Sequence, residues 1–219
     1  MRKAAWSAAA LLCAGVWAAD LTVSRALPAG GAAARSCDAT LELKWDNGSP
    51  MWLVVWSSGR GVWVGNDYDI ATISGYRGVE SIRMFSAPRW PNARWDGFRL
   101  GIFAFDGGVP GSLLWGPKFV VGTGTGDKWY DFRVGWTLPA ANDKFVSAIE
   151  QYYDFPNADP HTVDNDRTFL GHSWLYAAAG WRPYTNIHGY YNLMIRVVVY
   201  DETSAVAPTS LGRVKALYY

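Results

Sequence analysis

The sequence predicts an all-β protein, built as an antiparallel two-sheet β-sandwich of jelly-roll type. Three observations favour this fold. Short apolar or alternating runs, rich in β-branched and aromatic residues, recur from residue 40 to about residue 200, as strands do. Turn residues separate these runs, and Asn47-Gly48 is a strong hairpin signal. No stretch of this region shows a convincing 3.6-residue helical period.

We expect eight to ten strands. The first run alternates apolar and polar residues, and the second is continuously apolar. The connections are dense in Gly and Pro, above all at 106–111 and 122–126, which marks them as turns. Each sheet of such a sandwich buries one face and leaves the other in solvent. The expected strands, in chain order, are 41–45, 51–56, 61–64, 79–85, 98–105, 118–121, 129–134, 145–149, 173–176 and 193–200.

The first residues have the order of a cleavable signal peptide. A charged Met1-Arg2-Lys3 precedes an apolar run, 4–16, and a small-residue exit that ends at Ala18. This run is shorter than the ~20 residues that span a bilayer, and no later run is long enough. We therefore expect an exported protein, extracellular or at the cell surface, with no membrane span after cleavage. The expected division is a signal peptide at 1–18, a flexible linker at 19–39, the β-sandwich domain at 40–202, and a linker with a C-terminal tail at 203–219.

Charge and cysteine content exclude several classes of partner and site. Removal of Arg2 and Lys3 leaves 18 basic and 19 acidic residues, and the arginines are scattered, so no nucleic-acid partner is expected. Cys37 is the one cysteine left after cleavage, so no intramolecular disulfide and no two-cysteine motif can form. Oligomeric state and the fate of Cys37 stay open at this point.

From Trp45 onward, the order of features resembles a family of exported bacterial β-sandwich domains of jelly-roll type, found alone or appended to larger surface proteins. The resemblance implies a non-catalytic accessory or adhesion module and carries no catalytic residue set. Similarity of fold alone does not license an activity. The loop 152–167 is longer and more acidic than the pattern requires, so a special role is expected there. The residues that carry the resemblance are 45–48, 98–114, 129–132, 173–176 with Trp181, 192–197 and the tail 211–218.

No recognisable catalytic set is present, and the chain is predicted not to be an enzyme. The segment Gly171-His172-Ser173-Trp174-Leu175 lacks the second glycine of a nucleophile elbow. The histidines at 161, 172 and 188 do not share a metal-binding spacing. Glutamates are few and lie in separate strands, so a glycosidase pair of carboxylates cannot be derived.

A calcium site is a candidate in the long loop. Calcium binds several carboxylate and carbonyl oxygens, and the segment 159–166 is rich in them. The candidate ligands are Asp159, Asp164 and Asp166. Because Asp and Asn are also ordinary turn residues, the cofactor prediction is none, with calcium as the open alternative.

Aromatic residues are the most unusual feature of the composition. Eleven tryptophans remain after cleavage, and those within strands are expected to fill the core. Trp90, Trp95, Trp181 and Tyr184 fall outside the strand runs. Such rings either cap the ends of the sandwich or stack on the apolar face of a sugar, since exposed aromatic patches mark binding sites.

These observations lead to three functional hypotheses. The first is an exported, non-catalytic module that binds a glycan or another surface component through Trp90, Trp95, Trp181 and Tyr184. The second is a structural or surface-display module with an attachment tail that starts at Leu211. The third is a carbohydrate-active hydrolase or lyase, which requires two carboxylates facing each other across a groove.

Overall fold

The structure is a computed structural model of the chain, and it describes residues 40–58, 60–73, 75–86, 97–122, 128–165, 170–185 and 191–201. The predicted signal peptide, linker and C-terminal tail lie outside the described residues. Where it is described, the chain contains no helix that could cross a membrane.

The all-β prediction is confirmed, because the described residues form twelve strands that pair only in antiparallel fashion. The strands are β1 (Thr40–Leu43), β2 (Pro50–Val54), β3 (Val62–Asp69), β4 (Tyr76–Ser86), β5 (Phe98–Asp106), β6 (Val109–Val120), β7 (Lys128–Thr137), β8 (Lys144–Gln151), β9 (His161–Asp164), β10 (Ser173–Ala177), β11 (Gly180–Pro183) and β12 (Ile195–Asp201).

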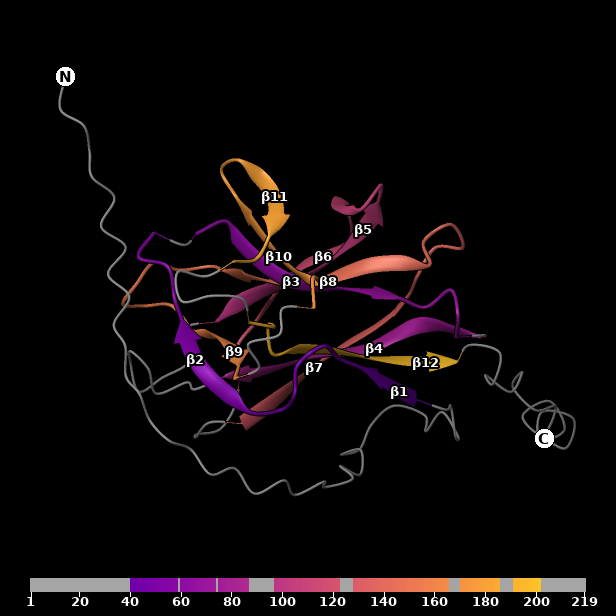
Figure 1. Cartoon of the computed structure of the whole chain (residues 1–219), viewed down its shortest axis with the longest axis horizontal. Helices are drawn as coiled ribbons and strands as arrows, with labels where there is room; N and C mark the ends of the chain where they lie inside the picture. Colours follow the sequence, from indigo (N-terminus) through magenta and orange to yellow (C-terminus); the bar gives the residue numbers. More distant parts are fainter. Residues whose placement is uncertain are drawn as a thin grey trace, which may run out of the picture.

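Two larger sheets and one small sheet make up the fold. The six-stranded sheet has the order β11-β10-β3-β8-β5-β6, and the four-stranded sheet has the order β1-β12-β4-β7. Figure 1 shows the first sheet above the second, with the pair β2 and β9 at one side. Strands β8 and β12 therefore occupy interior positions, each paired on both edges.

The main core lies between the two larger sheets. Residues of one parity from each sheet, such as Leu100 and Ile149 facing Ile82 and Val197, form one buried cluster. This follows from the two-residue period of a strand, which sends alternate side chains to the same face. The opposite face of the four-stranded sheet carries charged side chains, among them Glu80, Arg83 and Arg133.

The outer face of the six-stranded sheet carries a second cluster, made of Trp63, Val146, Ala148 and Trp174. We call it the outer cluster. Phe103, Phe105 and Trp181 pack against it. The edge strands β11 and β6 contact each other, so the sheet curls around these rings. Figure 1 shows the β10–β11 hairpin projecting from the body of the molecule.

Strand lengths differ most from expectation at β6, β9 and β11. The expected strand 118–121 is the end of a strand that begins at Val109, directly after a turn at Gly107 and Gly108. Strands β9 and β11 were not expected. Each has four residues, and β9 falls in the segment interpreted as an oxygen-rich turn. Pairing with β2 and β10, which local sequence does not reveal, makes these two segments strands.

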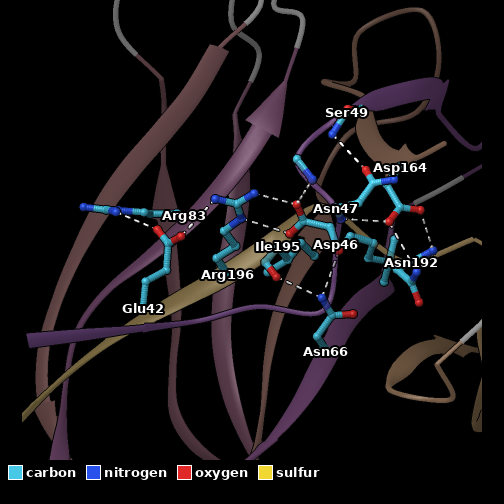
Figure 2. Close-up of polar contacts among 12 residues, drawn as sticks. Glu42, Asp46, Asn47, Ser49, Asn66, Arg83, Asp164, Asn192, Ile195 and Arg196 are labelled. Carbon is cyan, nitrogen blue, oxygen red and sulfur yellow. Dashed lines mark hydrogen bonds and ion pairs between the residues drawn. The ribbon is translucent and has the colours of Figure 1, made fainter. Parts of the chain in front are cut away.

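An ion-pair network fixes the N-terminal segment, residues 40–49, to the four-stranded sheet (Figure 2). Arg196 donates to both carboxylate oxygens of Asp46 at 2.6 and 3.0 Å and to Glu42 at 2.9 Å. Glu42 also accepts from Arg83 at 2.7 Å. The guanidinium of Arg196 lies 3.8 Å from the ring centre of Trp129. Because Arg196 is only 11% exposed and the side chain of Asp46 is buried, these contacts are shielded from solvent screening.

Candidate functional site

The ends of four neighbouring strands lie side by side at one end of the six-stranded sheet. The register pairs Val62 with Gln151, Gln151 with Phe98, and Phe98 with Val120. The start of β3, the end of β8, the start of β5 and the end of β6 therefore lie in one row. The residues that precede or follow these strands come together at this end of the sandwich.

Three aromatic rings form a cluster at this end. Phe119 near the end of β6 contacts Tyr152 and Tyr153, with ring centres 5.2 and 6.3 Å apart, and the two tyrosine rings are 4.9 Å apart. All three contacts are edge-to-face, which is a favourable arrangement of aromatic quadrupoles. We call these residues the aromatic trio. Phe119 is 44% exposed and Tyr153 is 39% exposed, so the cluster presents ring surface to solvent.

Two arginines lie beside the trio. The guanidinium carbons of Arg60 and Arg99 are 5.4 and 5.0 Å from the ring centre of Tyr152, which is cation–π distance. Arg99 also donates to both carboxylate oxygens of Glu150, through Nε and, at 2.6 Å, through Nη2. The Glu150 side chain is 1% exposed. Its hydrogen bonds raise the pKa of Arg99, so this guanidinium stays charged.

A buried amide positions Tyr153. Gln151 accepts the backbone N–H of Trp56 at 2.7 Å and donates to the carbonyls of Trp56 and Tyr153 at 2.7 and 2.9 Å. These bonds occupy the amide on both sides and tie two chain segments together. Arg60 adds a third tie, since its backbone N–H donates to Asp154 at 3.2 Å.

Asp159 anchors the backbone next to the trio. Its carboxylate accepts the N–H of Gly97 at 2.6 Å, and Ser86 donates to the carbonyl of Pro160 at 3.1 Å. Gly97 has a φ of +91°, and a Cβ there would lie 2.5 Å from the ring of Phe119. The ring of Phe119 can therefore pack over residue 97 only because this residue is glycine.

A small enclosed cavity lies beside Gln151 and Asp159. This cavity of about 10 Å³, lined by Trp56, Gln151, Asp159 and His161 among others, has room for roughly one water molecule. The indole nitrogen of Trp56 is buried and finds no hydrogen-bond acceptor among the described residues. A cavity of this size cannot hold a sugar ring.

The four aromatic residues predicted to bind a ligand are not brought together within the described chain. Trp90 and Trp95 lie outside the described residues. Trp181 packs on Phe103 and Tyr176 at 5.1 and 5.3 Å, beside the outer cluster.

Tyr184 does not supply an exposed ring. It is 1% exposed, and its hydroxyl lies 3.1 Å from Nε2 of His161. Its backbone N–H donates to the carbonyl of Ser173 at 2.7 Å, which draws the chain inward directly after β11. Burial raises the pKa of Tyr184, so its hydroxyl stays protonated.

The predicted calcium ligands make other contacts where they are described. The buried carboxylate of Asp164 accepts the backbone N–H groups of Asn47 and Asn192, each at 3.1 Å, and the side-chain amide of Asn192 at 3.3 Å (Figure 2). Burial raises its pKa. Asp159 accepts the backbone N–H of Gly97, and Asp166 lies outside the described residues. Within the described ranges, no group of three His, Cys, Asp or Glu residues could hold a metal ion.

An aspartate–histidine pair lies elsewhere, at the start of β10. His172 Nδ1 is 2.9 Å from Asp67, and the ring of Trp45 stacks on His172 at 3.6 Å. Such a pair activates a nucleophile when a hydroxyl or thiol lies beside the imidazole. The adjacent Ser173 hydroxyl instead donates to Asn66 at 2.8 Å and accepts the N–H of Leu193 at 3.1 Å. The neighbouring serine is therefore engaged in the core and does not complete a catalytic set.

The sequence analysis did not identify the three residues of the aromatic trio as site residues. The long acidic loop at 152–167 was singled out from the sequence, and Tyr152 and Tyr153 are its first two residues. Phe119 lies far from them in sequence, and only the register of β5, β6 and β8 brings the three rings together.

No family model and no curated protein matches this chain. Among solved structures, the chain is similar to the clostridial cysteine protease Cwp84 after propeptide cleavage, with a TM-score of 0.54 and 14% sequence identity, over 74% of this chain and 40% of that one. A structure of the cysteine protease and lectin-like domains of Cwp84, a surface layer associated protein of Clostridium difficile, matches with a TM-score of 0.46 and 15% identity, over 64% and 32% of the two chains. The chain thus spans less than half the length of the first of these structures, and the likeness to it is one of fold.

Proposed function

We propose that this protein is an exported, non-catalytic β-sandwich module that binds a glycan through the aromatic trio. The observation that carries the proposal is the solvent exposure of Phe119 and Tyr153 within one cluster of contacting rings. Exposed aromatic patches mark binding sites more often than isolated rings do. The rings are held by Gln151 and by the backbone ties around them, so a ligand would meet a preorganised surface.

Trp90 and Trp95 belong to the same proposal. The residues that border their segment, Ser86 and Gly97, both hydrogen-bond to the chain at residues 159–160. These two residues lie at the same end of the sandwich as the trio. Trp90 and Trp95 are proposed to take part in ligand binding, while Trp181 packs against the outer cluster and Tyr184 belongs to the core.

Export and surface location are part of the proposal. They rest on the signal-peptide pattern of residues 1–18 and on the resemblance to exported surface modules. The tail from Leu211 is proposed to decide whether the module is released or retained at the surface.

A glycan array followed by titration of the binding ligands tests the proposal. Tyr153→Ala is expected to weaken glycan binding by about tenfold or more, the effect typical of an aromatic hot spot. Tyr176→Ala is the matched control, because Tyr176 is also 39% exposed but belongs to the β10 surface. Phe119→Ala should reproduce the effect of Tyr153→Ala. Equal losses in the Tyr153 and Tyr176 variants, or no glycan binding by the purified chain, would contradict the proposal.

A further inference from the structure

We infer that the ligand of the aromatic trio is an acidic glycan whose sugar carboxylate is bound by Arg60; this inference rests on the glycan-binding function proposed above. Some hydrogen-bonding groups around the trio are already used within the protein, and others remain for a ligand.

The acceptors near the trio are largely used. Both carboxylate oxygens of Glu150 accept from Arg99, and this side chain is buried. The carbonyl oxygen of the Gln151 side chain accepts from Trp56, and Oδ1 of the exposed Asp154 accepts the backbone N–H of Arg60. A neutral sugar, whose hydroxyls need acceptors as well as donors, finds few acceptors here.

Several hydrogen-bond donors near the trio are not used by carboxylates of the described residues. Arg60 is exposed, and no carboxylate lies within ion-pair distance of its guanidinium among the residues that the structure describes. Its guanidinium contacts the ring of Tyr152. Arg99 uses Nε and Nη2 on Glu150, which leaves Nη1. The site therefore offers guanidinium N–H groups to a ligand that is rich in acceptors.

A carboxylate suits these donors best. The planar guanidinium fork matches the two oxygens of a carboxylate with two parallel hydrogen bonds. The guanidinium carbon of Arg60 lies 5.4 Å from the ring centre of Tyr152, and the ring centre of Tyr153 lies 4.9 Å from that of Tyr152. The guanidinium and the exposed ring of Tyr153 are thus both neighbours of Tyr152. A uronic acid can thus lie on the exposed rings while its carboxylate reaches Arg60.

The test uses two probes that differ only at the carboxyl group, which is charged in one and a neutral methyl ester in the other. Binding of a galacturonic acid hexamer and of its fully methyl-esterified form is measured by calorimetry with the purified full chain. The acid is expected to bind about tenfold tighter than the ester, because charge-assisted hydrogen bonds are roughly twice as strong as neutral ones. Arg60→Gln should reduce the affinity for the acid to that for the ester, and should leave the affinity for the ester unchanged.

Arg133→Gln is the matched control. It removes the same charge from the four-stranded sheet, where the Arg133 side chain is 72% exposed, and it should preserve the preference for the acid. Equal binding of both hexamers would overturn the inference, and so would a preference that survives Arg60→Gln. If both hexamers bind equally and both lose affinity in Tyr153→Ala, the carboxylate assignment fails while the glycan-binding function stands. If neither hexamer binds and the glycan array is also negative, both proposals fail.

Discussion

His161 shows how a single buried side chain makes stability depend on pH. Its Nε2 lies 3.1 Å from the Tyr184 hydroxyl, and its ring contacts the ring of Trp56 at 6.4 Å. Burial lowers the pKa of His161 from 6.5 to about 3, because a charged imidazole loses its hydration there.

This shift predicts a loss of stability on mild acidification. Between about pH 6.5 and pH 3 the unfolded chain protonates His161 while the folded protein keeps it neutral. The unfolded state then binds more protons, so the free energy of unfolding falls as the pH falls through this window, by up to about 1.4 kcal/mol per pH unit. Above pH 6.5 this contribution is constant. Urea unfolding from pH 7.5 to 4.5 measures the slope.

His161→Gln should flatten that slope, because glutamine can hydrogen-bond to Tyr184 and does not titrate. His172→Gln, which leaves His161 in place, is the control and should keep it. An identical pH dependence in the wild-type protein and in His161→Gln would show that burial of this ring does not control acid stability.

For single residues, the sequence predicted burial or exposure correctly at some positions and not at others. Leu100 and Ile149 are in the main core, as their strand runs indicate. Tyr184 lies outside the strands, as the sequence indicates, but its ring is buried. Local sequence shows Pro183 beside it but not the backbone bond to Ser173 that turns it inward. Phe119 was correctly predicted to lie in a strand. Its contacts with Tyr152 and Tyr153 could not be predicted, because they depend on the end of β8 lying close to the end of β6.

Among the secondary-structure elements, the turn that precedes β5 positions the site. Gly97 combines a positive φ with the packed ring of Phe119 and with the hydrogen bond to Asp159. Strand β6 must end against β5 in this register for the ring to reach residue 97. The site therefore depends on strand register as much as on its own side chains.

Gly97→Ala is predicted to disturb both stability and binding. A left-handed backbone costs a non-glycine residue about 1–2 kcal/mol, and the new Cβ would displace the ring of Phe119, 2.5 Å away. Gly107→Ala is the matched control: its φ is also positive at +62°, but a Cβ there meets nothing within 4 Å. Urea unfolding should show a loss of about 1 kcal/mol for Gly107→Ala and a larger loss for Gly97→Ala. Glycan affinity should fall only in the Gly97 variant, and equal affinities would argue against a role for this packing.

Element prediction succeeded where runs were long and failed where they were short. The expected strands at 98–105 and 145–149 match β5 and β8 closely, because each is largely buried and rich in β-branched or aromatic residues. Strands β9 and β11 have four residues each and polar or turn-like composition. They exist because of partners that are distant in sequence or joined by a two-residue turn, and local patterns do not encode such partners.

For the whole molecule, the N-terminal segment 40–49 acts as a strap that joins both sheets. Strand β1 pairs with β12 at the edge of the four-stranded sheet. The indole N–H of Trp45 then donates to the carbonyl of Asp67 in the six-stranded sheet at 2.6 Å. Asp46 binds Arg196, and Asn47 binds Asp164 beside the small sheet. Ten residues thus contact all three sheets.

This arrangement predicts where the chain can be shortened. A chain of residues 40–202, the domain expected from the sequence, retains every described contact and should unfold cooperatively. A chain of residues 50–202 loses Trp45 and leaves the largely buried Arg196 without Asp46. Breaking a buried ion pair in this way typically costs about 3–5 kcal/mol, so the shorter chain should unfold at a much lower urea concentration or fail to fold.

Asp46→Ala in the full chain tests the same idea if the shorter chain cannot be purified. It removes the carboxylate that holds Arg196 and keeps β1 and Trp45 in place. Arg77→Ala is the control, because its 2.7 Å ion pair with Asp143 is more exposed and exposed pairs contribute about 0–1 kcal/mol. A loss for Asp46→Ala no larger than that for Arg77→Ala would mean that burial of the Asp46–Arg196 pair does not hold the strap. The joining of the sheets would then rest on β1 pairing and on Trp45, whose replacement by Phe removes the bond to Asp67 and keeps an aromatic ring beside His172.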